Sequence, residues 1–229
     1  MVVGGLQRFS LIDYPGLPSA VVFTQGCNFA CRFCHNPELV DPHRFAKPIA
    51  LEEILAFLEK RKTQLKGVTV TGGEPTIHED LGDFLAVLKS MGYAIKLDTN
   101  GSRPAALESL YDRGLIDFIA MDVKAPLGAY KGIAGCDVCT SDIEDSIRLI
   151  ISMGTSHEFR TTILEQALSL EDALEIGRLV RGCARYVIQP FVPSKTIDKT
   201  LLALPKTREE TLTEIQGALV GTGIPCVIR

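Results

Sequence analysis

Short runs of apolar and β-branched residues alternate along this chain with stretches in which apolar residues recur every three or four positions. The first pattern predicts buried β-strands, and the second predicts helices with one buried face. Strands are expected at residues 20–25, 67–71, 93–98, 117–123, 158–163 and 185–189, with a short last one at 226–228. Helices are expected at 51–58, 81–88, 104–113 and 143–151. Two more are expected to begin with capping boxes, one at Ser169 and Asp172 and one, over 207–219, at Thr207 and Glu210. Residues 1–19 and 38–48 are rich in turn residues and are expected to be loops.

Six alternations of strand and helix predict an α/β fold whose parallel strands are joined by right-handed crossovers. Residues that could form a functional site fall at the carboxyl ends of different expected strands: Cys27, Gly72, Asp98, Asp122 and Gln189. In parallel α/β folds the functional site forms at these ends. A site fed by so many strands favours a curved sheet over a flat one.

Composition narrows the class of protein. The chain has 229 residues, 46% of them hydrophobic, which is enough for one sizeable core, and we expect a single domain over 1–229 with its core at about 20–191 and a C-terminal helix and strand at 205–229. A formal net charge of -4 without long Lys/Arg runs argues against a nucleic-acid or anionic-membrane partner. The N-terminus has no basic, apolar signal pattern, so a cytoplasmic location with reduced thiols is expected.

Three of the seven cysteines form a CxxxCxxC motif directly after the first expected strand: Cys27, Cys31 and Cys34. Three thiolates so close in sequence can bind one inorganic centre, and a 4Fe-4S cluster, which normally takes four cysteines, would keep one iron open for another ligand. The alternative is a zinc site that borrows a fourth ligand such as His35. Structural zinc sites usually contain a second cysteine pair, which the motif lacks.

The motif also identifies a family. CxxxCxxC with the aromatic Phe33 before its last cysteine, followed by TGGEP at 71–75, resembles the radical S-adenosylmethionine (SAM) superfamily. The stretches HNP at 35–37, DYPG at 13–16, DTNG at 98–101 and MDVK at 121–124 are similar to those of the enzymes that activate glycyl-radical enzymes. The opening GGLQRFSLIDYPG most resembles the activating proteins of anaerobic ribonucleoside-triphosphate reductase.

This resemblance implies a partial (β/α)6 barrel, open on one side, that carries a 4Fe-4S cluster on Cys27, Cys31 and Cys34. It implies an oxidoreductase that reductively cleaves SAM to a 5'-deoxyadenosyl radical and installs a glycyl radical on a partner protein. The expected partners are the anaerobic reductase and, as electron donor, a flavodoxin or ferredoxin. Alternatives are an activase of the pyruvate formate-lyase type, a radical SAM enzyme acting on a small molecule, such as a carboxy-deazaguanine synthase, and a non-enzymatic metal-binding module.

The resemblance assigns cofactor binding to residues around the motif and at two strand ends: Phe33, His35, Gly72, Gly73, Glu74, Asp122 and Lys124. Glycines at a strand end allow close backbone approach, and Glu74 suits the amino group of SAM, although a plain β-turn is the alternative. Asp122 and Lys124 are two positions apart, so they face the same side of their strand. A strand-end ion pair without a catalytic role is the alternative there.

Further residues are predicted for a cation and for the substrate. Asp98, Thr99 and Asp122 could supply oxygens to a monovalent cation, as the resemblance implies, unless 98–101 is only a turn. Arg160 could contact substrate, and Asp13 could pair with Arg160. The family histidine near the sixth strand is replaced by Gln189-Pro190-Phe191, which argues against pyruvate formate-lyase as the substrate. Cys136 and Cys139 form a separate CxxC, which with Cys183 and Cys226 could make a second site. We interpret them instead as a surface dithiol or incidental cysteines, since two thiols alone close no cluster.

Overall fold

The computed structural model describes all of residues 1–229, and by its packing the chain divides into two compact units. Unit 1 comprises Met1–Asn28, Glu38–Thr99 and Ala105–Ile119. Unit 2 comprises Phe29–Pro37, Asn100–Pro104 and Ala120–Arg229. A compact unit is not by itself an independently folding domain, so the expected single domain stays a prediction.

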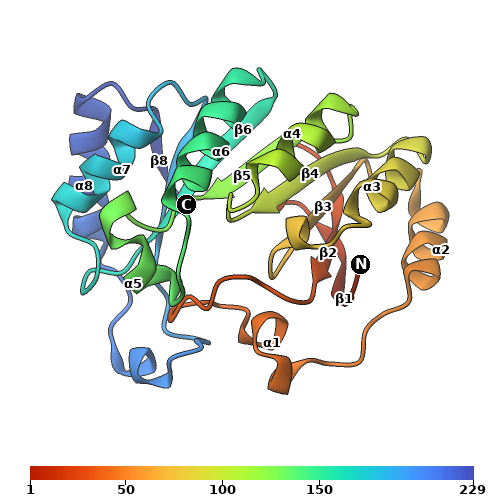
Figure 1. The fold of residues 1–229 in the computed structure, drawn as a ribbon, viewed down its shortest axis with the longest axis horizontal. Helices are drawn as coiled ribbons and strands as arrows, with labels where there is room; N and C mark the ends of the chain where they lie inside the picture. The colour runs from red at the N-terminus through yellow and green to blue at the C-terminus, as the bar shows by residue number, and fades with distance from the viewer. The chain divides into compact units, whose positions relative to one another are not determined.

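Unit 1 contains four neighbouring strands (Figure 1): β1 (Val3–Ser10), β2 (Ser19–Thr24), β3 (Gly67–Gly72) and β4 (Ala94–Thr99). Strand β1 runs antiparallel to β2, whereas β2, β3 and β4 run parallel. Val22 pairs with Val70 and Val70 pairs with Leu97, and all three side chains are fully buried. Apolar strands of this kind, covered on both faces, are typical of parallel sheets.

Three helices follow the strands of unit 1: α2 (Leu51–Arg61), α3 (Leu81–Ser90) and α4 (Pro104–Asp112). Helix α3 packs on β4 and buries Leu81, Phe84, Leu85 and Leu88, which are the residues that the helical spacing singled out. The predicted pattern of strand, helix and parallel strand is therefore confirmed in this unit.

Unit 2 contains the parallel strands β6 (Ser156–Ile163), β7 (Tyr186–Pro190) and β8 (Cys226–Ile228). Strand β5 (Phe118–Asp122) ends in this unit, where the N–H of Val123 donates to the carbonyl of Arg160 at 2.9 Å. The helices are α5 (Tyr130–Ala134), α6 (Thr140–Ser152), α7 (Leu170–Leu179) and α8 (Glu209–Gly221). Helices α7 and α8 pack against each other, and α8 also packs on β8 (Figure 1).

The two capping predictions have different outcomes. Ser169 caps α7, and its side chain and that of Asp172 form the expected capping box. At α8 the prediction is wrong, because the helix begins at Glu209 with Arg208 at the cap and no side-chain capping bond. The Thr207 hydroxyl instead accepts the N–H of Phe191 at 2.8 Å and donates to the carbonyl of Ile163, so it links the ends of β7 and β6.

The segments expected to be loops contain short regular elements. The largest correction is β1 in residues 1–19, which pairing with β2 stabilises despite its two glycines. Residues 38–48 contain most of helix α1 (Pro37–Val40) and the 3-10 helix η1 (Pro42–Arg44). Other short 3-10 helices are η2 (Pro75–Ile77), η3 (Leu127–Ala129) and η4 (Lys199–Ala203).

Candidate functional site

The cysteine loop runs through residues 27–37. Cys27 lies in unit 1, after β2, and Cys31 and Cys34 lie in unit 2. Cys31 and Cys34 are held together by a 3.0 Å hydrogen bond from the N–H of Cys34 to the carbonyl of Cys31. All seven cysteines of the chain are free thiols. The motif therefore offers thiol ligands that no disulfide has consumed.

Helix α5 fixes the cysteine loop at Phe29 and Ala30, where the loop enters unit 2. The N–H of Ala30 donates to the carbonyl of Ala134 at 2.8 Å, and the Phe29 ring packs edge-on against Tyr130, with 6.4 Å between ring centroids. Gly135 has a positive φ of 70°, and a Cβ there would lie 2.4 Å from the carbonyl oxygen of Ala30. A glycine is thus required where α5 ends against the loop.

The second half of the loop is held by the residues that follow β7. Phe33 is buried in a cluster with Leu164, Phe191 and Leu201. The His35 ring stacks on Phe191, with 5.8 Å between centroids, and its Nε2 lies 2.9 Å from the carbonyl oxygen of Val192. Both predicted cofactor residues therefore have a structural role in shaping the loop. His35 lies beside the residues that replace the family histidine.

The thiol of Cys31 is buried and lies among several charged or ionisable groups. Burial raises the pKa of its thiol to about 11, the ammonium of Lys124 acts in the opposite direction, and Cys34, Asp122 and Cys136 add to the rise. The Cys136 thiol is therefore close enough to Cys31 to affect it. This was not apparent from the sequence, where Cys136 is 105 positions beyond Cys31. The thiolate that a metal needs would gain its charge compensation from Lys124.

Next to the Cys31 thiol, the carboxylate of Asp122 pairs with two positively charged side chains. Its Oδ2 lies 3.1 Å from Nζ of Lys124, and its Oδ1 accepts a 2.7 Å hydrogen bond from Nε of Arg160. Burial opposes the charge on Asp122, but Arg160 and Lys124 outweigh it and hold the pKa of the carboxyl well below its usual range. For Lys124, burial is outweighed by Asp122 and Cys31, which keep its pKa raised. The shared face predicted for Asp122 and Lys124 is confirmed by this contact.

A residue that the sequence did not reveal completes this group. The Tyr130 hydroxyl accepts the backbone N–H of Lys124 at 3.1 Å, and its ring is fully buried against Phe29. Burial raises the pKa of Tyr130, so the phenol stays neutral. Tyr130 thereby connects the cysteine loop to the segment after β5. No periodicity marked it, because it lies in a stretch interpreted as a glycine-rich loop.

In unit 1, the glycines of TGGEP approach the chain's own backbone. A Cβ on Gly72 would lie 2.3 Å from the nitrogen of Thr24, and one on Gly73 would lie 1.9 Å from the carbonyl oxygen of Gly26. The N–H of Glu74 donates to that same Gly26 carbonyl at 2.8 Å. The structure thus gives these glycines a partner other than the predicted ligand, namely the segment that leads from β2 into the cysteine motif.

Glu74 is fully buried and already hydrogen-bonded. Its Oε1 accepts the N–H and hydroxyl of Thr76 at 3.1 and 2.6 Å, and the hydroxyl of Thr99 at 2.8 Å. A buried carboxylate with such donors is fixed in place rather than free to rotate. The turn at 71–75 is therefore a rigid element that ties the ends of β3 and β4.

The residues predicted to bind a cation have protein partners. Asp98 forms an ion pair with Lys96, a buried residue two positions earlier on β4, and Thr99 donates to Glu74. Lys96 was not among the predicted site residues, although its spacing from Asp98 is the same as that between Asp122 and Lys124. Asp13 accepts a hydrogen bond from Ser10, and Arg160 pairs with Asp122. The cation site stays a prediction.

The donor set fits an iron-sulfur cluster in its chemistry, because thiolates are the ligands that such clusters take and three free cysteines are available. The structure itself contains no group of three or more His, Cys, Asp or Glu residues that could hold a metal ion. Cys27, Cys31 and Cys34 are the residues that would hold the cluster.

Comparison with known proteins places these features in a family. The model of the Radical SAM superfamily matches residues 21–165. The Methanocaldococcus jannaschii protein MJ1227, which carries the name of a glycyl-radical enzyme activating enzyme, is 33% identical over 219 residues, or 93% of this chain and 90% of the relative. The pyruvate formate-lyase-activating enzyme of Clostridium pasteurianum is 26% identical over 204 residues, or 83% of each chain.

A solved structure shows the same fold. Streptococcus suis SuiB bound to S-adenosylmethionine superposes with a TM-score of 0.71 at 15% identity, over 91% of this chain and 49% of SuiB. This chain thus spans about half the length of SuiB, and the likeness concerns the fold alone.

The chain is a member of the radical SAM superfamily, whose enzymes use a 4Fe-4S cluster and SAM, and the predicted α/β partial barrel is confirmed. Within that superfamily it belongs to the glycyl-radical enzyme activating enzymes. None of its helices is both long and apolar enough to cross a membrane.

Proposed function

We propose that this chain activates an anaerobic ribonucleoside-triphosphate reductase by generating a radical on one of its glycines. The observation that carries the chemistry is the group formed by Cys31, Lys124, Asp122 and Arg160, in which a buried thiol lies next to a fixed pair of cations and one carboxylate. The choice of the reductase rests on the opening GGLQRFSLIDYPG and on Gln189-Pro190-Phe191 in place of the family histidine.

In this proposal Cys27, Cys31 and Cys34 hold the cluster. When bound, the cluster supplies one electron that splits SAM into methionine and a 5'-deoxyadenosyl radical, which takes the Cα hydrogen atom of the target glycine. Glu74 binds the amino group of SAM, with its carboxylate fixed by Thr76 and Thr99. No general base is needed, since a hydrogen atom is transferred rather than a proton.

The charged group after β5 positions the other end of the cofactor. Lys124 binds the carboxylate or ribose side of SAM, while Asp122 balances its charge. In this proposal Arg160, whose guanidinium is hydrogen-bonded to Asp122, contacts the backbone of the target segment. Because the radical must reach its glycine before water or oxygen, positioning is the main contribution of the protein. The electron comes from a flavodoxin or ferredoxin in an oxygen-poor cytoplasm.

The test is anaerobic reconstitution with iron and sulfide, reduction with dithionite, and incubation with SAM and the candidate reductase. A glycyl doublet in the electron paramagnetic resonance spectrum is expected, together with one methionine released per radical formed. A parallel incubation with pyruvate formate-lyase is expected to give no doublet. A doublet only with pyruvate formate-lyase would move the assignment to that type of activase.

A matched pair of variants tests the ligand assignment. Cys31→Ala should abolish SAM cleavage, and Cys139→Ala, which removes an exposed thiol outside the motif, should leave it unchanged. Full cleavage by Cys31→Ala would disprove the ligand role. Methionine release without any glycyl doublet would favour a radical SAM enzyme acting on a small molecule, such as a carboxy-deazaguanine synthase. Absence of both reactions from the reconstituted wild type would overturn the enzymatic proposal.

A further inference from the structure

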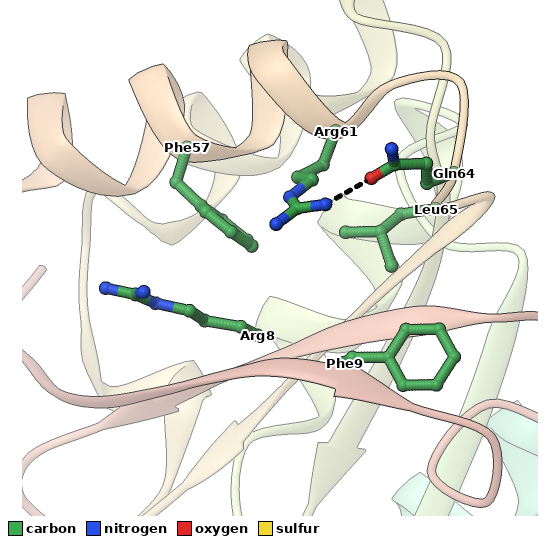
Figure 2. Close-up of a pocket in the computed structure, with 6 residues that line it drawn as sticks. All are labelled: Arg8, Phe9, Phe57, Arg61, Gln64 and Leu65. Carbon is green, nitrogen blue, oxygen red and sulfur yellow. Dashed lines mark hydrogen bonds between the residues drawn. The ribbon is translucent and has the colours of Figure 1, made fainter.

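A cavity of about 350 Å³ lies in unit 1 between β1 and the carboxyl end of α2. Its lining consists of Arg8, Phe9, Phe57, Arg61, Gln64 and Leu65 (Figure 2). The volume falls at the lower end of the range for ligand pockets, about 300–1,000 Å³. The activating reaction described above makes no use of these residues.

Two guanidinium groups converge on one aromatic ring in this cavity. Cζ of Arg8 lies 5.7 Å from the centroid of the Phe57 ring, and Cζ of Arg61 lies 6.0 Å from it (Figure 2). Arg61 also donates to Oε1 of Gln64 at 2.5 Å. No Asp or Glu lines the cavity, and the carboxylate of nearby Glu59 pairs with Lys62 instead. The cavity therefore holds two like charges that an anion would neutralise.

The surroundings extend this positive charge. Lys60 and Lys66 are exposed close to Arg61 in sequence, in a chain whose formal net charge is -4, so the basic character is local. The guanidinium is suited to bidentate contacts with carboxylates and stacks well on aromatic rings. A ligand that combines carboxylates with an apolar group would use both features.

Large apolar side chains are exposed at the end of β1, in Phe9 of the cavity lining and in two residues that follow it in the chain. Phe9, Leu11 and Ile12 are 55%, 66% and 83% exposed. The hydroxyl of Ser10 accepts the N–H groups of Ile12 and Asp13 at 3.2 and 3.1 Å, which makes a tight turn directly after β1. Three large exposed apolar side chains within four consecutive positions are more than the single scattered ones of an ordinary surface, and such groups are typical of protein contact sites.

We propose that Arg8, Arg61, Phe9, Leu11 and Ile12 form a docking surface for an acidic segment of a partner protein, with carboxylates in the cavity and an apolar side chain on the residues after β1. A small anion would neutralise the arginines but leave Leu11 and Ile12 uncovered, since neither lines the cavity. Complementary charge at such a surface mainly accelerates association and selects the partner. The proposal rests on this surface alone and does not depend on the identity of the glycyl-radical substrate.

The test uses fluorescence polarisation with a fluorescein-labelled peptide, Gly-Asp-Glu-Leu-Phe-Asp-Glu-Gly, and two relatives in which its acids are replaced by amides or by lysines. The wild type should bind the acidic peptide, and more weakly as salt rises. Binding should fall about tenfold or more in R8E/R61E, because both charge pairs become repulsive. The lysine peptide should in turn prefer R8E/R61E. An acidic peptide that binds the wild type no better than its amide relative would overturn the proposal.

Two sets of controls make the outcome decisive. R178E/R181E changes the net charge equally at exposed residues of unit 2, so an equal loss there would show general electrostatics and count against the site. Circular dichroism checks the fold, and R8Q/R61Q gives a milder variant if the double reversal does not fold. L11A/I12A should also weaken the peptide. If L11A/I12A binds the acidic peptide as tightly as the wild type does, and citrate at the same concentration as the peptide displaces it, the cavity binds small anions and the docking proposal fails.

Discussion

Arg160 donates a 2.7 Å hydrogen bond from Nε to Oδ1 of Asp122, and this contact joins β6 to the end of β5 at the level of the predicted cofactor site. Lys124 occupies the other oxygen of the same carboxylate at 3.1 Å. One negative charge therefore holds two positive charges, with a surplus of positive charge left for an anionic group. The carboxylate of SAM is such a group, and the Cys31 thiolate of a loaded cluster is another.

Asp122→Asn should destabilise the protein by about 1–3 kcal/mol. Breaking a fully buried ion pair costs about 3–5 kcal/mol and losing an exposed one about 0.2–1 kcal/mol, and the side chain of Asp122, 35% exposed, lies between these cases. Urea unfolding of the cluster-free protein measures the change. Asp83→Asn, which removes an exposed partner 3.5 Å from Arg113, is the matched control and should change stability by less than about 0.5 kcal/mol. Equal losses in the two variants would contradict the prediction.

The same group predicts a dependence on pH. Because the pKa of Asp122 is lower in the folded state than its ordinary value of 3.8, the unfolded chain binds the proton first as the solution becomes acidic. The stabilising contribution is therefore present above about pH 4 and is lost as the pH falls below it. Urea unfolding between pH 3 and 7 should show a shallower acid-side decline for Asp122→Asn than for the wild type. Parallel curves for the two proteins would show that Asp122 does not cause the loss of stability at acid pH.

The sequence predicted the helices and strands better than it predicted the side-chain contacts of the site residues. Periodicity located α3 and the parallel strands because the buried positions of a helix or strand repeat at a fixed spacing. It missed β1, since an antiparallel strand with two glycines is stabilised by pairing with β2 rather than by its own composition. It named Glu74 and Asp98 as site residues without their partners. The Thr99 hydroxyl that donates to Glu74 comes from another chain segment, which a linear pattern does not record. Lys96 lies two positions before Asp98 on β4, so its spacing was available in the sequence.

Gly73→Ala should be among the most damaging small substitutions in the chain. A Cβ at this position would lie 1.9 Å from the carbonyl oxygen of Gly26, a backbone atom that cannot rotate away, so a loss of about 3 kcal/mol or more is expected. Gly217→Ala in α8 meets nothing within 4 Å and should stabilise the protein by about 0.5–1 kcal/mol. Thermal unfolding of both variants should therefore shift in opposite directions, and a shared direction would contradict the backbone contact.

Thr207→Val tests the link that replaces the predicted helix cap. The variant removes the hydroxyl that connects Phe191 to Ile163, while Phe191 N–H keeps its 3.1 Å bond to the Ile163 carbonyl. A loss of about 0.5–1.5 kcal/mol is expected, because two buried hydrogen bonds are removed while the Phe191 N–H and the Ile163 carbonyl keep their bond to each other. Thr213→Val, whose hydroxyl bonds to Glu209 on the exposed face of α8, should change stability by less than about 0.5 kcal/mol. If Thr207 acted as a cap, the helical signal of α8 would fall instead, which circular dichroism would detect.

Cysteine labelling should distinguish the thiols outside the motif. Cys183 and Cys226 are buried, and burial raises the pKa of the first to about 11 and of the second to about 12, so both stay protonated and inaccessible near neutral pH. Cys139 is exposed and should react first with iodoacetamide, since alkylation needs an accessible thiolate. Mass spectrometry of the folded protein at pH 7.5 should show Cys139 modified and Cys183 and Cys226 intact, with all three modified in urea. Rapid labelling of Cys183 or Cys226 without denaturant would contradict their burial in unit 2 and would reopen a reactive role for them.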